Sequence, residues 1–317
     1  MRTTFISTFR RCMAVVLVGL VAASLGACSP YLYKNEVADF GGGVKAVATA
    51  YDDGMTAYAQ ERSDRQQVQW RLDRAKLAKT PGCEIGVGPG ATTDESCELR
   101  LAGPGTPPPP GPPSTLERVG PELVAPLQRY AAALVAITDA QDREQLIAAQ
   151  AQLQESLDGF AKTTGSPTIP LDPVFAITRV FLDQSRYDVL KRSVLAADPQ
   201  IPKIAAALGV ALDTLRGNRA DELNLALEAR ARTLSSGLPQ DVYDSRLDGA
   251  MRDRNALEAL RGSNPAAAAD KMVKAHRALA EALQDNQRQI ASVTAAAQEF
   301  YDAAVALQKA FAIAGAA

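Results

Sequence analysis

The chain of 317 residues contains a single histidine, His276, and few aromatic residues, which make up 5% of it. One histidine cannot build a His-rich metal centre, and it leaves little scope for histidine-dependent catalysis within one chain. An excess of one charge is also missing, because 34 basic residues nearly balance 36 acidic ones. Nucleic-acid binding depends on a positive surface, so we expect no nucleic-acid partner.

Sequence signatures of common enzymes are missing as well. The chain has no Gly-x-Ser-x-Gly, no Ser-x-x-Lys and no Walker loop. Neighbouring carboxylates occur at Asp52-Asp53, at Asp142 and Glu144, and at Asp221-Glu222. Residues one or two apart on a helix do not face each other, so we predict that these acids lie on solvated faces. The expectation is a protein that is not an enzyme, with no catalytic residue, no metal site and no cofactor.

The N-terminus has the features of an export signal. Arg2, Arg10 and Arg11 precede an apolar run from Met13 to Ala23, and small residues follow. A permanent membrane-spanning helix needs about 20 apolar residues, so this run is too short for one.

The sequence Leu25-Gly26-Ala27-Cys28 resembles the lipobox of bacterial lipoproteins. The resemblance implies that residues 1–27 are a signal peptide, that Cys28 receives a diacylglycerol, and that the new N-terminus is acylated. Several acyl chains anchor a protein stably, whereas one chain binds only marginally. Ser29 follows the cysteine instead of aspartate, which in Gram-negative lipoproteins implies the outer membrane. We therefore expect a lipid-anchored protein of the cell envelope, on the outer membrane and facing the periplasm.

Removal of the signal peptide changes the charge and the cysteine count. Three arginines leave with residues 1–27, so the net charge falls from −2 to −5 and the lipid, rather than charge, must hold the membrane. Cys12 is also lost and Cys28 is acylated, which leaves Cys83 and Cys97. In an exported protein this pair predicts a disulfide, with two free thiols as the alternative.

Composition divides the mature chain into a tether, a helical body and an insertion. Residues 28–43, which end in Gly41-Gly42-Gly43, predict a lipidated flexible tether, because each glycine costs about 1 kcal/mol in a helix interior. Residues 44–317 predict a single helical-bundle domain. Residues 80–114 predict a loop insertion in that domain, since nine prolines and seven glycines lie between 81 and 113.

Apolar residues three and four apart predict helices throughout the body. The longest such series predicts one heptad seam of about 40 residues, and it consists of Met272, His276, Leu279, Leu283, Asn286, Ile290, Val293, Ala297, Phe300, Ala304, Leu307 and Phe311. No segment has the alternation of a strand. The predicted fold class is all-α, an elongated bundle of about six to eight long antiparallel helices with a Pro/Gly-rich, disulfide-bearing loop.

His276 lies on the predicted seam. We interpret it as a packed polar residue or one partly solvated at the seam edge, with a ligand-binding or catalytic role as the alternative.

The favoured function is a non-enzymatic scaffold, spacer or protein-docking module in the cell envelope. Its expected partners are the membrane, through the lipid on Cys28, and an envelope protein; the oligomeric state is not predicted. The alternative is a carrier of an apolar ligand or lipid within the bundle. Less favoured is a glycan-acting enzyme that uses carboxylates alone, which would need two acids about 5–10 Å apart.

Overall fold

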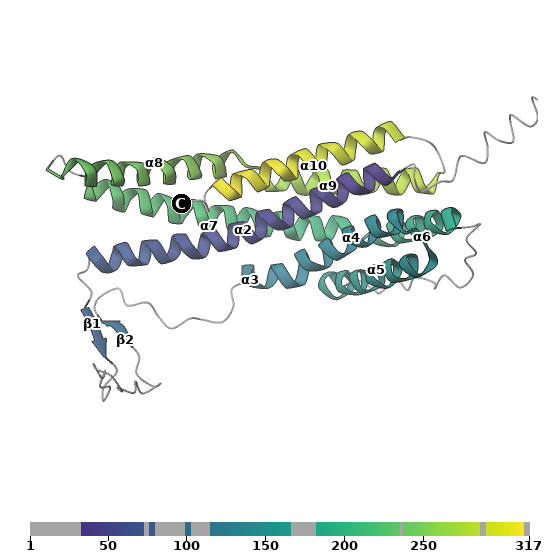
Figure 1. The fold of residues 1–317 in the computed structure, drawn as a ribbon, viewed down its shortest axis with the longest axis horizontal. Helices are drawn as coiled ribbons and strands as arrows, with labels where there is room; N and C mark the ends of the chain where they lie inside the picture. Colours follow the sequence, from purple (N-terminus) through teal and green to yellow (C-terminus); the bar gives the residue numbers. More distant parts are fainter. Residues whose placement is uncertain are drawn as a thin grey trace, which may run out of the picture. The chain divides into compact units, whose positions relative to one another are not determined.

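The structure is a computed structural model that describes residues 33–72, 76–79, 99–102, 115–165, 182–234, 237–285 and 290–313. The fold is all-α, a bundle of helices, as predicted (Figure 1). The helices are α2 (Lys34–Leu72), α3 (Thr115–Val119), the π-helical turn η3 (Gly120–Val124), α4 (Ala125–Asp139), α5 (Arg143–Thr164), α6 (Leu182–Ala197), α7 (Ile201–Thr233), α8 (Gln240–Gly262), α9 (Pro265–Gln284) and α10 (Ile290–Ile313).

The body divides into two compact units, where the sequence predicted a single helical-bundle domain for 44–317. Unit 1 contains the start of α2, η3, α4, α5, α6, the start of α7, α9 and most of α10. Unit 2 contains the rest of α2, two short strands, α3, the rest of α7, α8 and the end of α10. Three of the boundaries fall inside the continuous helices α2, α7 and α10, where the spacing of apolar residues does not change, so the sequence pattern could not locate them.

The tether predicted over 28–43 is wrong from Tyr33 onward. Tyr33 is buried, α2 begins at Lys34, and the three glycines lie inside this helix. A Cβ on Gly43 would lie 2.6 Å from a ring carbon of Phe300. The glycines therefore let α2 approach its neighbours closely, and this packing outweighs their low helix propensity.

This role of glycine gives a paired prediction for Gly43→Ala and Gly217→Ala. Both residues lie inside helices, but a Cβ on Gly217 has no atom within 4 Å. Gly217→Ala should raise the free energy of unfolding by up to about 1 kcal/mol through helix propensity. Gly43→Ala should lower it, because Phe300 is fully buried and overpacking costs about 1–3 kcal/mol. Chemical denaturation measures both, and equal gains would show that Gly43 is not at a close contact.

The predicted C-terminal seam forms two helices instead of one. α9 ends at Gln284, where the Asp285 N–H donates to the Glu281 carbonyl, and α10 begins at Ile290. Asn286 lies outside the described residues. Both helices bury their predicted apolar faces. The three- and four-residue spacing of apolar residues therefore continues from α9 into α10, and the sequence pattern does not reveal that α9 ends. The buried seam residues are Met272, His276, Leu279, Leu283, Val293, Ala297, Phe300, Ala304, Leu307 and Phe311.

A short antiparallel ladder is the only β-structure among the residues that the structure describes. β1 (Lys76–Lys79) pairs with β2 (Leu99–Ala102), with Lys76 opposite Ala102 and Lys79 opposite Leu99. Four residues are too few to display a clear alternation, so the sequence did not predict these strands. β2 also corrects the predicted insertion, because part of 80–114 is a strand.

Candidate functional site

A chain of three polar side chains crosses the core of unit 1. His276 on α9 is fully buried, and its Nε2 lies 2.7 Å from the hydroxyl of Tyr130 on α4. Its Nδ1 lies 3.1 Å from Oδ1 of Asp198, in the turn before α7. The Asp198 side chain is 35% exposed, so the series runs from the surface to the interior.

The partners determine which ring nitrogen carries the proton. The Asp198 carboxylate only accepts hydrogen bonds, so Nδ1 of His276 donates to it. In the neutral ring Nε2 then accepts, and the Tyr130 hydroxyl is the donor. Each of these contacts joins α9 to a different element, so the three side chains fix how α4, α9 and the start of α7 pack.

Burial is the main influence on the acid–base behaviour of this group. It lowers the pKa of His276 below 6.5, although the Asp198 carboxylate opposes the shift, and it raises the pKa of Tyr130 well above its usual value. The hydrogen bond from His276 lowers the pKa of Asp198. His276 is therefore a neutral hydrogen-bonding residue in the folded protein at neutral pH.

Aromatic rings surround the buried histidine. Phe40 of α2 lies 5.8 Å from its ring and 5.6 Å from the ring of Phe300, while Tyr130 lies 5.4 Å from Phe160, all between centroids. An Asp–His–hydroxyl series can activate a nucleophile where the hydroxyl meets substrate. Here the Tyr130 hydroxyl lies inside the core, so the geometry is that of a packed polar residue, and the partly solvated position at the seam edge is wrong.

The buried histidine predicts a pH dependence of stability. Below pH 6.5 the unfolded chain binds a proton on His276 that the folded chain does not, so the free energy of unfolding should fall as the pH falls from 6.5. Above 6.5 the histidine is neutral in both states and contributes no slope. Asp198 adds a further loss only below 3.8, its value in the unfolded chain. Urea unfolding from about pH 8 to about pH 5 measures the slope.

His276→Gln provides the comparison, because the chain has no other histidine. The variant should be less stable at neutral pH and should have a smaller slope between about pH 6.5 and pH 5. Identical slopes in the parent and the variant would mean that His276 titrates as freely in the folded chain as in the unfolded one.

Ion pairs between arginine and carboxylate join the helices of unit 2. Nη2 of Arg219 on α7 lies 2.8 Å from Oε1 of Glu61 on α2, and the Arg219 side chain is fully buried. Arg65 pairs with Glu222 one turn further along the same two helices. Nε of Arg230 lies 2.7 Å from Oδ2 of Asp253, which joins α7 to α8.

Two of the carboxylates that were predicted on solvated faces have a structural partner. Glu222 is buried and paired with Arg65, so the solvated position predicted for it is wrong. Asp142, by contrast, is the N-cap of α5 and accepts from the Gln145 N–H at 2.8 Å. The partners of Glu61 and Glu222 lie 158 and 157 residues away, a distance over which the sequence gives no pairing signal.

A surface hollow of about 420 Å³ lies beside η3 in unit 1. Two prolines, Pro121 and Pro126, are among its lining residues. Pro126 has no N–H to offer the Glu122 carbonyl four residues earlier, and Thr163 of α5 donates to that carbonyl at 2.7 Å instead. The lining residues are Pro121, Glu122, Pro126, Arg129, Gly159, Lys162 and Thr163. Charged residues at its edge distinguish it from an enclosed apolar ligand cavity.

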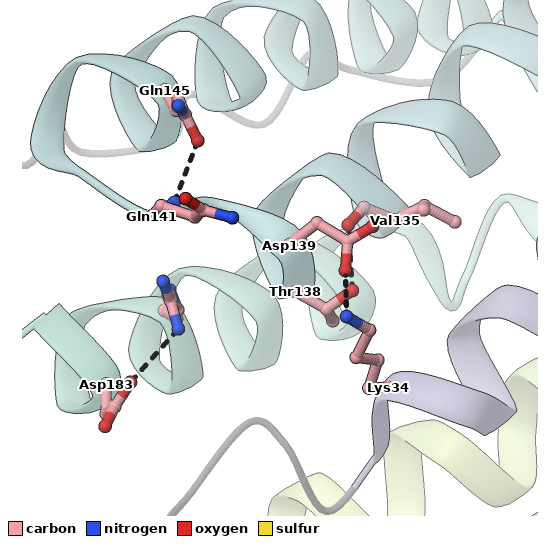
Figure 2. A network of polar contacts seen from close by, with 8 residues as sticks. Lys34, Val135, Thr138, Asp139, Gln141, Gln145 and Asp183 are labelled. Atoms are coloured by element: carbon pink, nitrogen blue, oxygen red, sulfur yellow. Dashed lines mark hydrogen bonds and ion pairs between the residues drawn. The ribbon is translucent and has the colours of Figure 1, made fainter.

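A network of polar contacts lies at the end of unit 1 where α2 begins (Figure 2). Lys34 Nζ lies 2.7 Å from Asp139 Oδ1, which ties the start of α2 to the end of α4. The Gln141 N–H donates to Gln145 Oε1 at 2.8 Å and helps start α5.

The residues predicted as lipidation and disulfide sites, Cys28, Cys83 and Cys97, lie outside the described residues. Within the described ranges, no three His, Cys, Asp or Glu side chains are grouped as metal ligands. A search of the same part of the chain finds no helix long and apolar enough to cross a membrane. Comparisons with protein-family models, curated proteins and solved structures find no significant match.

Proposed function

We propose that the chain is an exported lipoprotein whose helical body is a non-enzymatic docking module, held close to the membrane by the lipid on Cys28. The observation that carries this proposal is the short chain between Cys28 and Tyr33, which is buried and is the first residue that the structure describes. Five residue steps span at most about 18 Å. The lipid would therefore hold the start of α2 close to the membrane, which suits docking to a membrane-associated partner.

The use of the polar side chains also supports docking over catalysis. His276, Glu61 and Glu222 each have a polar partner on another helix and hold the fold together. The charged edge of the hollow beside η3 favours docking over the carriage of an apolar ligand.

Photo-cross-linking in intact cells tests the docking role. A photoreactive residue is placed in turn at exposed positions of α5, α7 and α8. We expect discrete adducts of constant mass from some positions, and their loss when Cys28→Ala releases the body from the membrane. An envelope-associated protein that gives no discrete adduct from any position would contradict the docking function.

We also propose the disulfide between Cys83 and Cys97. The β1–β2 ladder pairs Lys79 with Leu99 and so brings together the two ends of the segment that contains both cysteines. Closing about 15 residues would contribute roughly 3 kcal/mol in the chain-entropy model. Peptide mapping by mass spectrometry without reductant should find the two cysteines joined, with a Cys83→Ser/Cys97→Ser variant as the reference. Two free thiols in protein isolated from the envelope would contradict it.

A further inference from the structure

An apolar stripe on α8 faces away from the contacts that hold α8 to α7. Tyr243, Leu247 and Met251 are four residues apart and so share one side of the helix. Leu247 and Met251 are 38% and 46% exposed. The buried residues of α8 are a different set, which consists of Gly249, Asp253, Ala256, Leu257 and Leu260.

Acidic residues border this stripe. Asp241, Asp244 and Asp248 are exposed, and none of them forms an ion pair with any residue that the structure describes. The helix dipole favours Asp241 in the first turn, but Asp248 lies two turns further along.

Two nearby arginines of the α7–α8 hairpin are used elsewhere. Arg246 donates to the Thr233 carbonyl at 2.6 Å, and Arg230 is paired with Asp253. Arg252 and Arg254 follow at the far end of the stripe, where Arg254 is paired with Glu258. The side of α8 that carries Leu247 and Met251 is thus apolar along its middle, with acidic residues along its border from Asp241 to Asp248.

We propose that the Tyr243–Leu247–Met251 stripe of α8 binds an amphipathic helix of an envelope protein that carries lysine or arginine beside its apolar face. The proposal rests on the docking function above and names its surface and its partner class. Such a helix would cover the apolar side chains, and its basic residues would meet Asp244 and Asp248. Exposed charge pairs add little affinity each, but together they select the partner and speed its association.

The acidic border also argues against a lipid surface as the occupant. An anionic membrane surface would be repelled by Asp241, Asp244 and Asp248. The charge of the border is therefore the feature that selects a basic helix.

Peptide binding to the full-length chain purified from cells tests the proposal. The probe is a synthetic helix of about 20 residues with leucines on one face and lysines beside them. A matched peptide has glutamate in place of every lysine. We expect the lysine peptide to bind about tenfold or more tightly than the glutamate peptide, with an affinity that falls as salt is added.

Variants of the stripe and its border locate the binding. Leu247→Glu or Met251→Glu should weaken the lysine peptide about tenfold, and Asp244→Lys with Asp248→Lys should reverse the preference between the peptides. Ile147→Glu is the matched control, because Ile147 on α5 is 42% exposed and lies outside the stripe, and it should change neither affinity.

Three results would overturn the proposal. One is equal binding of the two peptides, and another is unchanged binding by Leu247→Glu and Met251→Glu while both variants retain the helical signal of the parent. The third is a stripe-dependent association with phosphatidylglycerol vesicles or with a second copy. Cross-linked adducts from α5 or α7 would then still support the docking function, so the two failures are distinguishable.

Discussion

Glu61→Leu should lower the free energy of unfolding by about 3–5 kcal/mol, because it leaves the Arg219 guanidinium buried without its carboxylate. Arg219 is fully buried, and Glu61 is 10% exposed at the side chain. Nη1 of Arg219 also donates to the Phe311 carbonyl at 2.9 Å, and its guanidinium lies 5.8 Å from the Phe311 ring. Those contacts keep the arginine in place but do not neutralise its charge.

The pair itself should contribute much less than the single change suggests. Burial raises the pKa of Glu61 and exceeds the opposing effect of its hydrogen bonds to Arg219, so the fold gains little from the ionised pair. Replacing both residues, Glu61→Leu with Arg219→Met, should therefore restore most of the stability that Glu61→Leu removes. A double-mutant cycle by chemical denaturation measures this coupling.

Arg254→Met is the control for the cycle. Arg254 pairs with Glu258 on the exposed side of α8, where both side chains are about 60% exposed, so its loss should change the stability by less than about 0.5 kcal/mol. A Glu61→Leu variant as stable as Arg254→Met, or a double variant whose loss is the sum of the single losses, would contradict the account of this pair.

Cys28→Ala should abolish attachment to the outer membrane. Acyl chains on Cys28 are the proposed anchor, and in the described part of the chain no helix could replace them by crossing the bilayer. We expect the variant to remain unprocessed or to leave the outer-membrane fraction after cell fractionation. Cys12→Ala, which changes a cysteine inside the signal peptide, should fractionate like the parent.

The same fractionation can contradict the lipobox interpretation. If Cys28→Ala stayed with the outer membrane as fully as Cys12→Ala, the attachment would not depend on the lipid. A loss in both variants would indicate a defect of export instead of anchoring.

The sequence predicted helices well where a single face is buried. Leu146, Leu153, Leu157 and Phe160 follow the spacing of one helix face and are buried in α5, and the same holds for the predicted seam residues of α9 and α10. The three- and four-residue spacing is a local property of one helix. It can therefore be recognised in the sequence without knowing which helices pack against it.

The failures have a common cause in contacts between distant segments. Gly41-Gly42-Gly43 resembled a tether by composition, but Phe300 packs against Gly43 from the far end of the sequence. Arg219 and Glu61 are likewise remote in sequence and adjacent in unit 2. Helix propensity contributes about 1 kcal/mol per glycine, and such packing outweighs it.

The candidate sites likewise combine local features that the sequence shows with distant contacts that it does not show. From its place on the seam, His276 was interpreted as a packed polar residue or one partly solvated at the seam edge. Its partners Tyr130 and Asp198 belong to other elements and were not predicted. The α8 stripe has an ordinary helical spacing, and only the structure distinguishes its exposed residues from buried ones.

Intact mass spectrometry of the protein purified from membranes tests the central claim most directly. The account predicts a chain of residues 28–317 whose N-terminal peptide carries a diacylglycerol on the Cys28 sulfur and an acyl chain on the amine. An N-terminus at any other residue, or a Cys28 without lipid, would contradict it.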